Sequence, residues 1–229
     1  MLAILGPMAG KRAYDDPCGI ARALDVVGER WALLVVRELV LGPKRFTDLR
    51  TGLRGVSTDV LSQRLRQLEQ AGVLRQVTLP PPGATRAYEL TDRGRELEPV
   101  LHALGRWGSR EPFPASDREM SVDAFAVALS TVFDPERAGD LDAVVALEVG
   151  TDLLVARVRD GRLVLRRGRA ESPDAVIRAD VPQLREVLWR GRPLPEGERE
   201  GDVRVTGSRS VVRRFLKLFP APVPAPTPL

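Results

Sequence analysis

Polar side chains that can donate or accept hydrogen bonds gather on one side of a predicted helix over residues 58–70. Three leucines, Leu61, Leu65 and Leu68, share one face of a 3.6-residue helical wheel. The opposite side carries Thr58 at the first turn, then Asp59, Ser62, Gln63, Arg66 and Gln70, and Arg64 lies on the margin, where it could reach a phosphate. Groups of this kind suit contacts with base edges and phosphates. An ordinary solvated helix also has a polar side, so the flanking segments must decide between the two interpretations.

A second short helix is predicted just before this one, over residues 47–53. Thr47 is the predicted N-cap, and Asp48 is favourable beside the positive helix end. Gly55 can turn the chain without steric cost, and Ser57 can cap the following helix. Two short helices joined by a tight glycine turn are typical of a helix-turn-helix.

Two strands follow, over residues 73–77 and 87–90, after Gly72 ends the helix. The loop between them, residues 79–85, contains three prolines and is too long for a two-residue hairpin. With Arg75 and Arg86 at its base, it suits a wing lying along a nucleic-acid backbone, although a plain hairpin loop remains an alternative. Together these segments favour double-stranded DNA as a partner.

Residues from about 14 to 110 resemble the HxlR family of bacterial winged-helix transcription regulators. The landmarks are Cys18, Val27 to Trp31, Leu41-Gly42, Arg45-Phe46, Leu61 to Leu65, Leu68-Glu69, Gly72-Val73, Tyr88 to Thr91, and Gly94 through Trp107. The resemblance implies a homodimer on a pseudo-palindromic operator. The candidate DNA-contacting residues are Arg45, Ser57, Thr58, Asp59, Ser62, Gln63, Arg64, Arg66, Arg75 and Arg86.

The single cysteine, Cys18, has two interpretations. Members of the resembled family use a cysteine near this position as a redox switch, and Arg22, one turn on, could lower its pKa. The family often has Cys-Pro where this chain has Cys18-Gly19, and buried, inert cysteines are common. We favour the structural role.

Composition limits the possible functions. Residues 1–110 hold 17 Lys and Arg against 12 Asp and Glu, whereas the remainder holds 18 against 19, so the positive excess lies on the half predicted to meet phosphates. One cysteine cannot form an internal disulfide. No apolar run is long enough to span a membrane, and Lys11 and Arg12 follow the apolar N-terminus, the wrong order for a secretory signal. We expect a cytoplasmic protein without a membrane partner.

Three further helices are expected to support the DNA-binding unit, over residues 20–27, 31–40 and 92–109. Thr91 can cap the last of them, which carries a broad apolar stripe. In the resembled family this helix joins the N-terminal helices at the dimer interface; intrachain packing is the alternative. His102, the only histidine, is expected to be a packed or surface residue and not a metal ligand.

The second half of the chain predicts a helix, an antiparallel meander with an Asp160-Gly161 turn, then a helix, a Gly/Pro loop from Gly191 to Gly201, a strand and a final helix. It resembles the sterol-carrier-protein fold, which implies an apolar cavity for a hydrophobic small-molecule effector. The same residues could instead fill a solid core. They are Phe125, Leu129, Val145, Leu147, Leu188, Trp189, Phe215 and Phe219.

The expected fold class is therefore α+β, with a winged helix-turn-helix followed by one mostly antiparallel sheet covered by helices. The expected segments are a flexible N-terminus at 1–13, the DNA-binding and dimerisation domain at 14–110, a linker at 111–117, the α+β domain at 118–220 and a Pro-rich tail at 221–229. We find no catalytic constellation, cofactor motif or paired metal ligands in the sequence. Two functions stay open: a ligand-responsive DNA-binding transcription regulator, or a lipid or small-molecule carrier whose winged helix makes only protein contacts.

Overall fold

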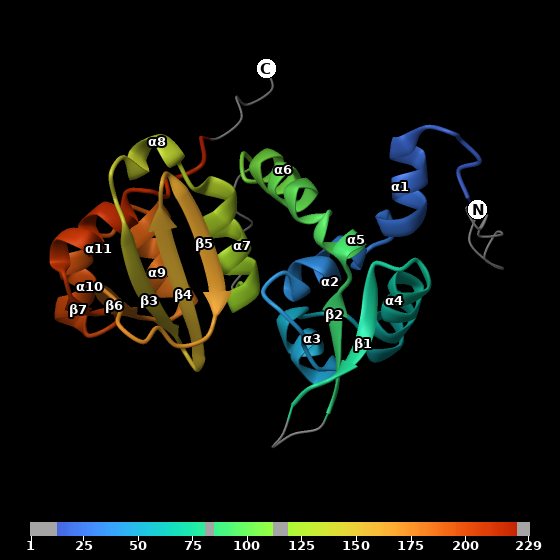
Figure 1. The fold of residues 1–229 in the computed structure, drawn as a ribbon, viewed down its shortest axis with the longest axis horizontal. Helices are drawn as coiled ribbons and strands as arrows, with labels where there is room; N and C mark the ends of the chain where they lie inside the picture. The colour runs from blue at the N-terminus through green and yellow to red at the C-terminus, as the bar shows by residue number, and fades with distance from the viewer. Residues whose placement is uncertain (1–12, 81–84, 112–118, 224–229) are drawn as a thin grey trace.

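The computed structural model describes residues 13–80, 85–111 and 119–223 as two domains, each with its own hydrophobic core (Figure 1). The fold is α+β, as predicted. The predicted linker and Pro-rich tail lie largely outside the described residues. The N-terminal domain contains α1 (Gly19–Val27), α2 (Ala32–Leu39), α3 (Phe46–Gly52), α4 (Thr58–Gln70), β1 (Leu74–Thr78), β2 (Arg86–Leu90), α5 (Asp92–Arg95) and α6 (Glu98–Gly108).

The helix-turn-helix consists of α3 and α4. Its first cap differs from the prediction: Arg45 and not Thr47 is the N-cap residue of α3, and its backbone N–H donates to the Asp48 carboxylate at 3.2 Å. Ser57 caps α4 as predicted, its hydroxyl accepting from the Val60 N–H at 3.3 Å. Gly72 follows α4 with a φ of +69°, the left-handed conformation that a glycine C′ residue adopts readily.

The wing is an antiparallel pair in which Leu74 faces Leu90 and Thr78 faces Arg86. Lys44 forms an isolated β-bridge with Tyr88 of β2. The Lys44 N–H donates to the Tyr88 carbonyl at 2.9 Å, and the Tyr88 N–H donates to the Lys44 carbonyl at 2.8 Å. The segment preceding α3 is therefore joined to the wing through backbone hydrogen bonds. Residues 81–84 of the predicted loop lie outside the described residues.

The helix predicted over residues 92–109 is divided into α5 and α6. Pro99 accounts for the break: it lacks an N–H, so it is accommodated in the first turn of a new helix more easily than within a continuous one. Thr91 caps α5 as predicted, accepting from the Gly94 N–H at 3.1 Å.

The C-terminal domain contains one five-stranded sheet with helices packed against it (Figure 1). Its elements are α7 (Val122–Val132), α8 (Pro135–Ala138), β3 (Ala143–Val149), β4 (Asp152–Arg159), β5 (Arg162–Arg167), β6 (Ala175–Arg178), α9 (Val181–Trp189), α10 (Leu194–Glu200), β7 (Arg204–Gly207) and α11 (Arg209–Leu216). The strand order is β5-β4-β3-β6-β7, and all neighbours are antiparallel except β3 and β6.

The predicted meander is confirmed, and Asp160 and Gly161 both have positive φ at its turn. Two helices were not predicted. The segment from Gly191 to Gly201 was expected to be a loop, but α10 forms there because Pro195 lies in its first turn, where proline is tolerated. The other, α8, likewise begins with a proline, Pro135.

The eight residues predicted to line a ligand cavity lie in or against the C-terminal core. Phe125, Leu129, Val145, Leu147, Phe215 and Phe219 are at most 3% exposed, and Leu188 and Trp189 pack against them. Phe215 and Phe219 stack edge to face with centroids 5.0 Å apart. These side chains therefore lie in or against a packed core, and one of them, Trp189, also lines an apolar cleft beside it.

The two domains are packed together. Helix α7 lies against α2 and α6, and Leu41 of the N-terminal domain packs on the C-terminal core. His102 on α6 shares a hydrogen bond with the Thr131 hydroxyl of α7 at 2.9 Å, so it is a packed residue, as predicted. Within the described residues, no helix is both long and apolar enough to cross a membrane.

Candidate nucleic-acid interface

Helix α4 separates its two faces as the sequence predicted. Leu61, Leu65 and Leu68 are at most 1% exposed and pack in the N-terminal core. The opposite face is open to solvent: Ser57, Thr58, Asp59, Gln63, Arg66 and Gln70 are exposed, and Ser62 is half-buried. The side chains of Gln63 and Arg66 make no hydrogen bond or ion pair with any described residue. Their donors and acceptors are therefore free for a ligand.

Arg64 does not lie where the sequence suggested. It was expected on the margin of α4, within reach of a phosphate, but it is only 7% exposed. Its guanidinium hydrogen-bonds the Gln67 side chain and pairs with Glu29 at 3.4 Å. The Glu29 partner lies beyond the end of α1 and its own side chain is 44% exposed, so the guanidinium ends at the surface of the domain while the rest of Arg64 is covered. Arg64 thus ties α4 to the segment that follows α1.

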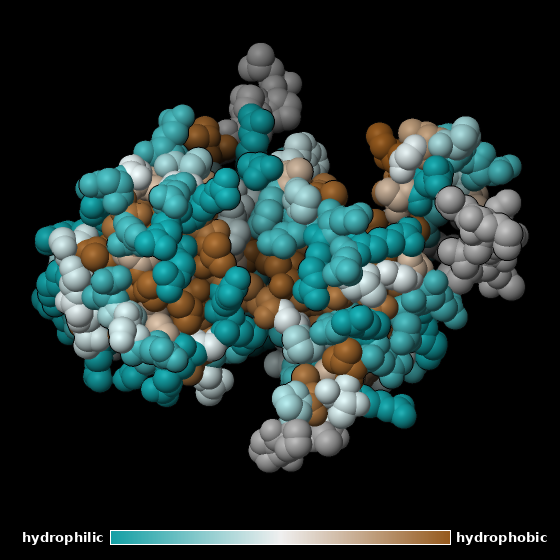
Figure 2. Space-filling view, in the orientation of Figure 1, coloured by the Kyte–Doolittle hydropathy of each residue, from teal (hydrophilic) through white to brown (hydrophobic). Residues whose placement is uncertain are grey.

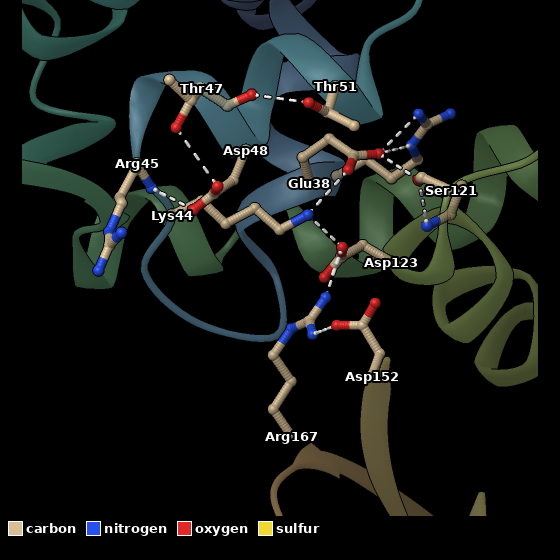
Figure 3. Close-up of polar contacts among 12 residues, drawn as sticks. Glu38, Lys44, Arg45, Thr47, Asp48, Thr51, Ser121, Asp123, Asp152 and Arg167 are labelled. Atoms are coloured by element: carbon tan, nitrogen blue, oxygen red, sulfur yellow. Dashed lines mark hydrogen bonds and ion pairs between the residues drawn. The ribbon is translucent and has the colours of Figure 1, made fainter. Parts of the chain in front are cut away.

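The three remaining predicted arginines lie on the segment before α3 and on the wing. Arg45 is exposed, and its side chain points away from Glu38 and Lys44 (Figure 3). Arg86 is exposed on β2. Arg75 is also exposed, but its charge is partly neutralised by Glu89, whose carboxylate lies 2.6 Å from the guanidinium.

A charged network at the junction of the domains was not foreseen from the sequence (Figure 3). The carboxylate of Asp123 on α7 binds Lys44 of the N-terminal domain and, at 2.7 Å, Arg167 of β5. Lys44 also donates to Glu38 at 3.0 Å, and the Ser121 hydroxyl donates to Glu38 at 2.7 Å. Because Lys44 and Asp123 are 79 positions apart, no local pattern identifies the pair.

This network links the wing and the C-terminal domain through one residue. Lys44 is bonded to Tyr88 by its backbone and to Asp123 by its side chain. Both carboxylates of the network are buried, Glu38 at 0% and Asp123 at 1% exposed. Buried charges are tolerated only when they are paired and hydrogen-bonded, so the contacts hold the two domains in one arrangement.

The stability contributed by Glu38 is expected to fall in acid. Burial raises the pKa of its carboxyl, but Lys44, Arg37 and the Ser121 hydrogen bond outweigh burial and hold the pKa below its ordinary value. A carboxyl with a lowered folded-state pKa stabilises the protein above the unfolded-state pKa of about 4.3, and this contribution disappears as the pH falls through the folded-state pKa. In urea titrations from pH 7 to pH 3, we expect the advantage of the wild type over Glu38→Gln to shrink as the pH falls. A difference that is constant with pH would contradict this prediction.

Cys18 is exposed at the start of α1, so packing in a core does not explain it. The backbone N–H groups of Ile20 and Ala21 lower the pKa of its thiol, and Arg22 is not among the causes, contrary to our expectation. The positive end of a helix favours a thiolate. We expect iodoacetamide to alkylate Cys18 with a pH midpoint below that of a short cysteine peptide measured in parallel. Equal midpoints would contradict this, and Cys18→Ser gives the background.

The fold and the exposed face of α4 define a winged helix-turn-helix DNA-binding domain. Residues 26–114 match the model of the HxlR-like helix-turn-helix family. An uncharacterized HTH-type transcriptional regulator of Bacillus subtilis, YvaP, is 35% identical over 88 residues, which cover 38% of this chain and 82% of YvaP. The chain belongs to the HxlR-like helix-turn-helix family.

Other similar proteins are also bacterial regulators. An uncharacterized HTH-type transcriptional regulator of Synechocystis sp. is 41% identical over 92 residues, covering 40% of this chain and 68% of that protein. Among solved structures, the reduced form of the transcriptional regulator YodB from B. subtilis has 29% sequence identity and a TM-score of 0.37, covering 43% of this chain and 98% of that one.

The C-terminal domain matches a different family. Residues 113–225 match the alkyl sulfatase C-terminal model, so the resemblance to the sterol-carrier-protein fold stays a prediction. Over the described ranges, no group of three or more His, Cys, Asp or Glu side chains is arranged to hold a metal ion.

Proposed function

We propose that this protein is a homodimeric, sequence-specific transcription regulator that binds a pseudo-palindromic operator. The observation that carries the proposal is the polar face of α4, which is solvent-exposed while its leucines are buried. A helix of this kind enters the major groove with its N-terminal residues near base edges. Gln63 and Arg66 would contact bases, with Thr58, Asp59 and Ser62 beside them. Arg45, Arg75 and Arg86 would contact the phosphate backbone.

The proposed dimer is supported by apolar side chains that remain exposed on α1 and α6. Ile20 is 72% exposed, Trp107 71%, and Leu24, Val100 and Leu104 between 41% and 46%. Figure 1 shows α1 projecting from the rest of the N-terminal domain, and Figure 2 shows apolar side chains open to solvent there. Large apolar side chains concentrated on two helices mark an interaction surface. A two-fold dimer through these helices would present two copies of α4 to the two half-sites of an operator.

Selection of duplex DNA from a random pool by the full chain tests this function directly. We expect the enriched sequences to contain an inverted repeat, with half-sites about one helical turn (10–10.5 base pairs) or a multiple of it apart. Sedimentation of the protein with a selected duplex should give two chains per duplex. Failure to enrich any sequence would reject the proposal in favour of the carrier function.

The C-terminal domain is proposed to regulate DNA binding in response to a hydrophobic small molecule. Its contact with α2 and its ion pair with Lys44 give it a physical connection to the DNA-binding unit. A ligand that prefers one arrangement of the domains would change operator affinity, typically by about 5- to 150-fold. This role requires no catalysis and places the protein where chromosomal DNA is, in the cytoplasm.

A further inference from the structure

Strand β5 is the edge of the five-stranded sheet that faces the N-terminal domain (Figure 1). It pairs with β4 on one side, and no described strand pairs with its other side. A groove of about 770 Å³ runs along β5, and the consecutive residues from Leu163 to Arg167 all line it. A strand edge of this kind presents unpaired backbone groups that another extended chain can bond.

The register of the β4–β5 pair shows which backbone groups of β5 point away from β4. The Gly168 N–H donates to the Leu153 carbonyl of β4 at 2.9 Å, so every second residue before it, from 166 back to 162, also bonds to β4. In an antiparallel pair, such residues alternate with residues whose N–H and C=O point away from the partner strand. Those residues have no backbone hydrogen bond with a described residue, and they are Leu163, Leu165 and Arg167.

The groove is apolar on the side of the sheet that the helices cover. Helix α7 contributes Phe133 to it, and the segment after α2 contributes Leu41. Both pack against the C-terminal core, as do Leu163 and Leu165 of β5. In a strand added to β5, successive side chains would point to opposite faces of the sheet. Every second side chain would therefore meet these apolar groups, so an occupant needs apolar residues at alternate positions.

Most polar side chains that line the groove already have partners. His102 shares a hydrogen bond with Thr131, and its other ring nitrogen lies 3.6 Å from the Glu98 carboxylate. Arg167 is held in the charged network at the junction of the domains. Ser130 of α7 has a hydroxyl that can donate or accept, so it sets no requirement for charge.

Two arginines of the groove are available for an acidic ligand. Arg166 alternates with the core-facing Leu165, so it lies on the outer face of the sheet, where it makes no hydrogen bond or ion pair with a described residue. Arg95 is exposed, and its pairing with Asp92 is loose, at 4.0 Å. The charged residues that line the groove are three arginines and one glutamate. Carboxylates therefore suit those side chains of an added strand that lie on the outer face, beside Arg166.

We propose that the free edge of β5 binds an extended segment of a partner protein, as an added antiparallel strand in which apolar and acidic side chains alternate. Backbone bonds to Leu163 and Leu165 would supply affinity, and the groove would select the side chains. A second copy of the chain suits this edge less well. Two β5 strands paired about a two-fold axis would bring like charges together, because Arg162, Arg166 and Arg167 of each copy would face the same arginines of the other. Binding at this edge does not depend on the proposed DNA-binding function.

Fluorescence anisotropy with the full chain tests for this binding. The probe is a peptide, labelled with a neutral dye, in which valine and glutamate alternate over six residues, the length of β5. We expect saturable binding of one peptide per chain. A peptide with lysine in place of glutamate should bind at least about tenfold more weakly, because like charges would then face each other. Equal binding of the two peptides would overturn the proposal.

Backbone methylation of the probe distinguishes an added strand from a peptide held by charge alone. Directly opposed residues of an antiparallel pair carry their side chains on the same face, so valines opposite Leu163 and Leu165 would bond to β5. N-methylation of the valines removes these donors and should weaken binding by at least about tenfold. N-methylation of the glutamates is the matched control and should leave binding nearly unchanged, because their N–H groups would face away from β5. Equal binding of the two methylated peptides would exclude strand addition.

Arg166→Glu reverses the charge beside the added strand and should weaken binding of the probe by about fivefold. The matched control is Arg204→Glu, the same change at an exposed position on β7, the opposite edge strand of the sheet. It should leave binding unchanged. If Arg166→Glu does not fold, as judged by circular dichroism, the two methylated peptides carry the test with the wild type. No saturable binding to the wild type, equal losses in the two variants, or binding that falls as self-association rises would each reject the proposal, the last because a second copy would then cover β5.

Discussion

The double substitution Gln63→Ala and Arg66→Ala is expected to reduce specific operator affinity by at least about 100-fold. Truncating one side chain that reads a base costs about 1–3 kcal/mol, and in a dimer the substitution acts at both half-sites. Both side chains are exposed and make no hydrogen bond with described residues, so the fold should be unaffected. Fluorescence anisotropy with a selected duplex measures the effect, and thermal denaturation checks the fold.

The control for this prediction is Arg162→Ala. Arg162 is exposed on β5 of the C-terminal domain, so its removal takes away one positive charge without touching α4. We expect its operator affinity to remain close to that of the wild type at the same salt concentration, because phosphate attraction depends on charges near the DNA. Specific binding that persists unchanged in the double variant would show that α4 is not the recognition helix.

Asp123→Ala is expected to destabilise the protein by about 3 kcal/mol, the largest effect on stability that we predict for a single substitution. Removing one member of a buried ion pair leaves the partner charge without compensation, which costs about 3–5 kcal/mol. Lys44 would lose Asp123 with only 12% of its side chain exposed, although Glu38 would remain as a partner. Arg167 is 32% exposed and would regain some hydration, so we place the effect at the lower limit. Urea denaturation measures it.

Asp152→Ala tests whether the loss of stability depends on the burial of the carboxylate that is removed. Asp152 pairs with the same Arg167, but its side chain is 34% exposed. Ion pairs that water can reach contribute about 0–1 kcal/mol, so this variant should lose less than about 1 kcal/mol. Equal losses for the two variants would contradict the importance that we assign to the domain junction.

The helix-turn-helix could be predicted because its signals are local. The Ser57 cap depends only on the N–H three residues later, and the end of α4 at Gly72 depends only on the conformation of that glycine. The leucine spacing of α4 defines its buried face. Most strands were predicted for the same reason, since alternation and turn residues act over short distances. The errors arose at prolines, because a proline can either interrupt a helix or lie in its first turn. Pro99 divides one predicted helix, and Pro195 lies in a helix where a loop was expected.

The tertiary structure decided the roles of three predicted features. Arg64 was placed on the margin of α4 by the helical wheel, but in the structure it is only 7% exposed and its guanidinium contacts Glu29, 35 positions away. The apolar residues proposed for a cavity lie in or against the C-terminal core, and only the packed structure shows this, because which side chains meet across a sheet and its helices depends on packing and not on spacing. The exposure of Cys18 and the amides that lower its pKa likewise became visible only in the fold.

By itself, the sequence determined the class of protein and its helix-turn-helix, because helix periodicity, caps and turns act over a few residues. Only the tertiary structure decided how the two domains meet. The Lys44–Asp123 pair and the cleft between α2, α6 and α7 join residues that lie far apart along the chain, 79 positions in the case of the ion pair. Interactions over such a separation leave no periodic trace in a single sequence, and they are fixed only when both cores have formed.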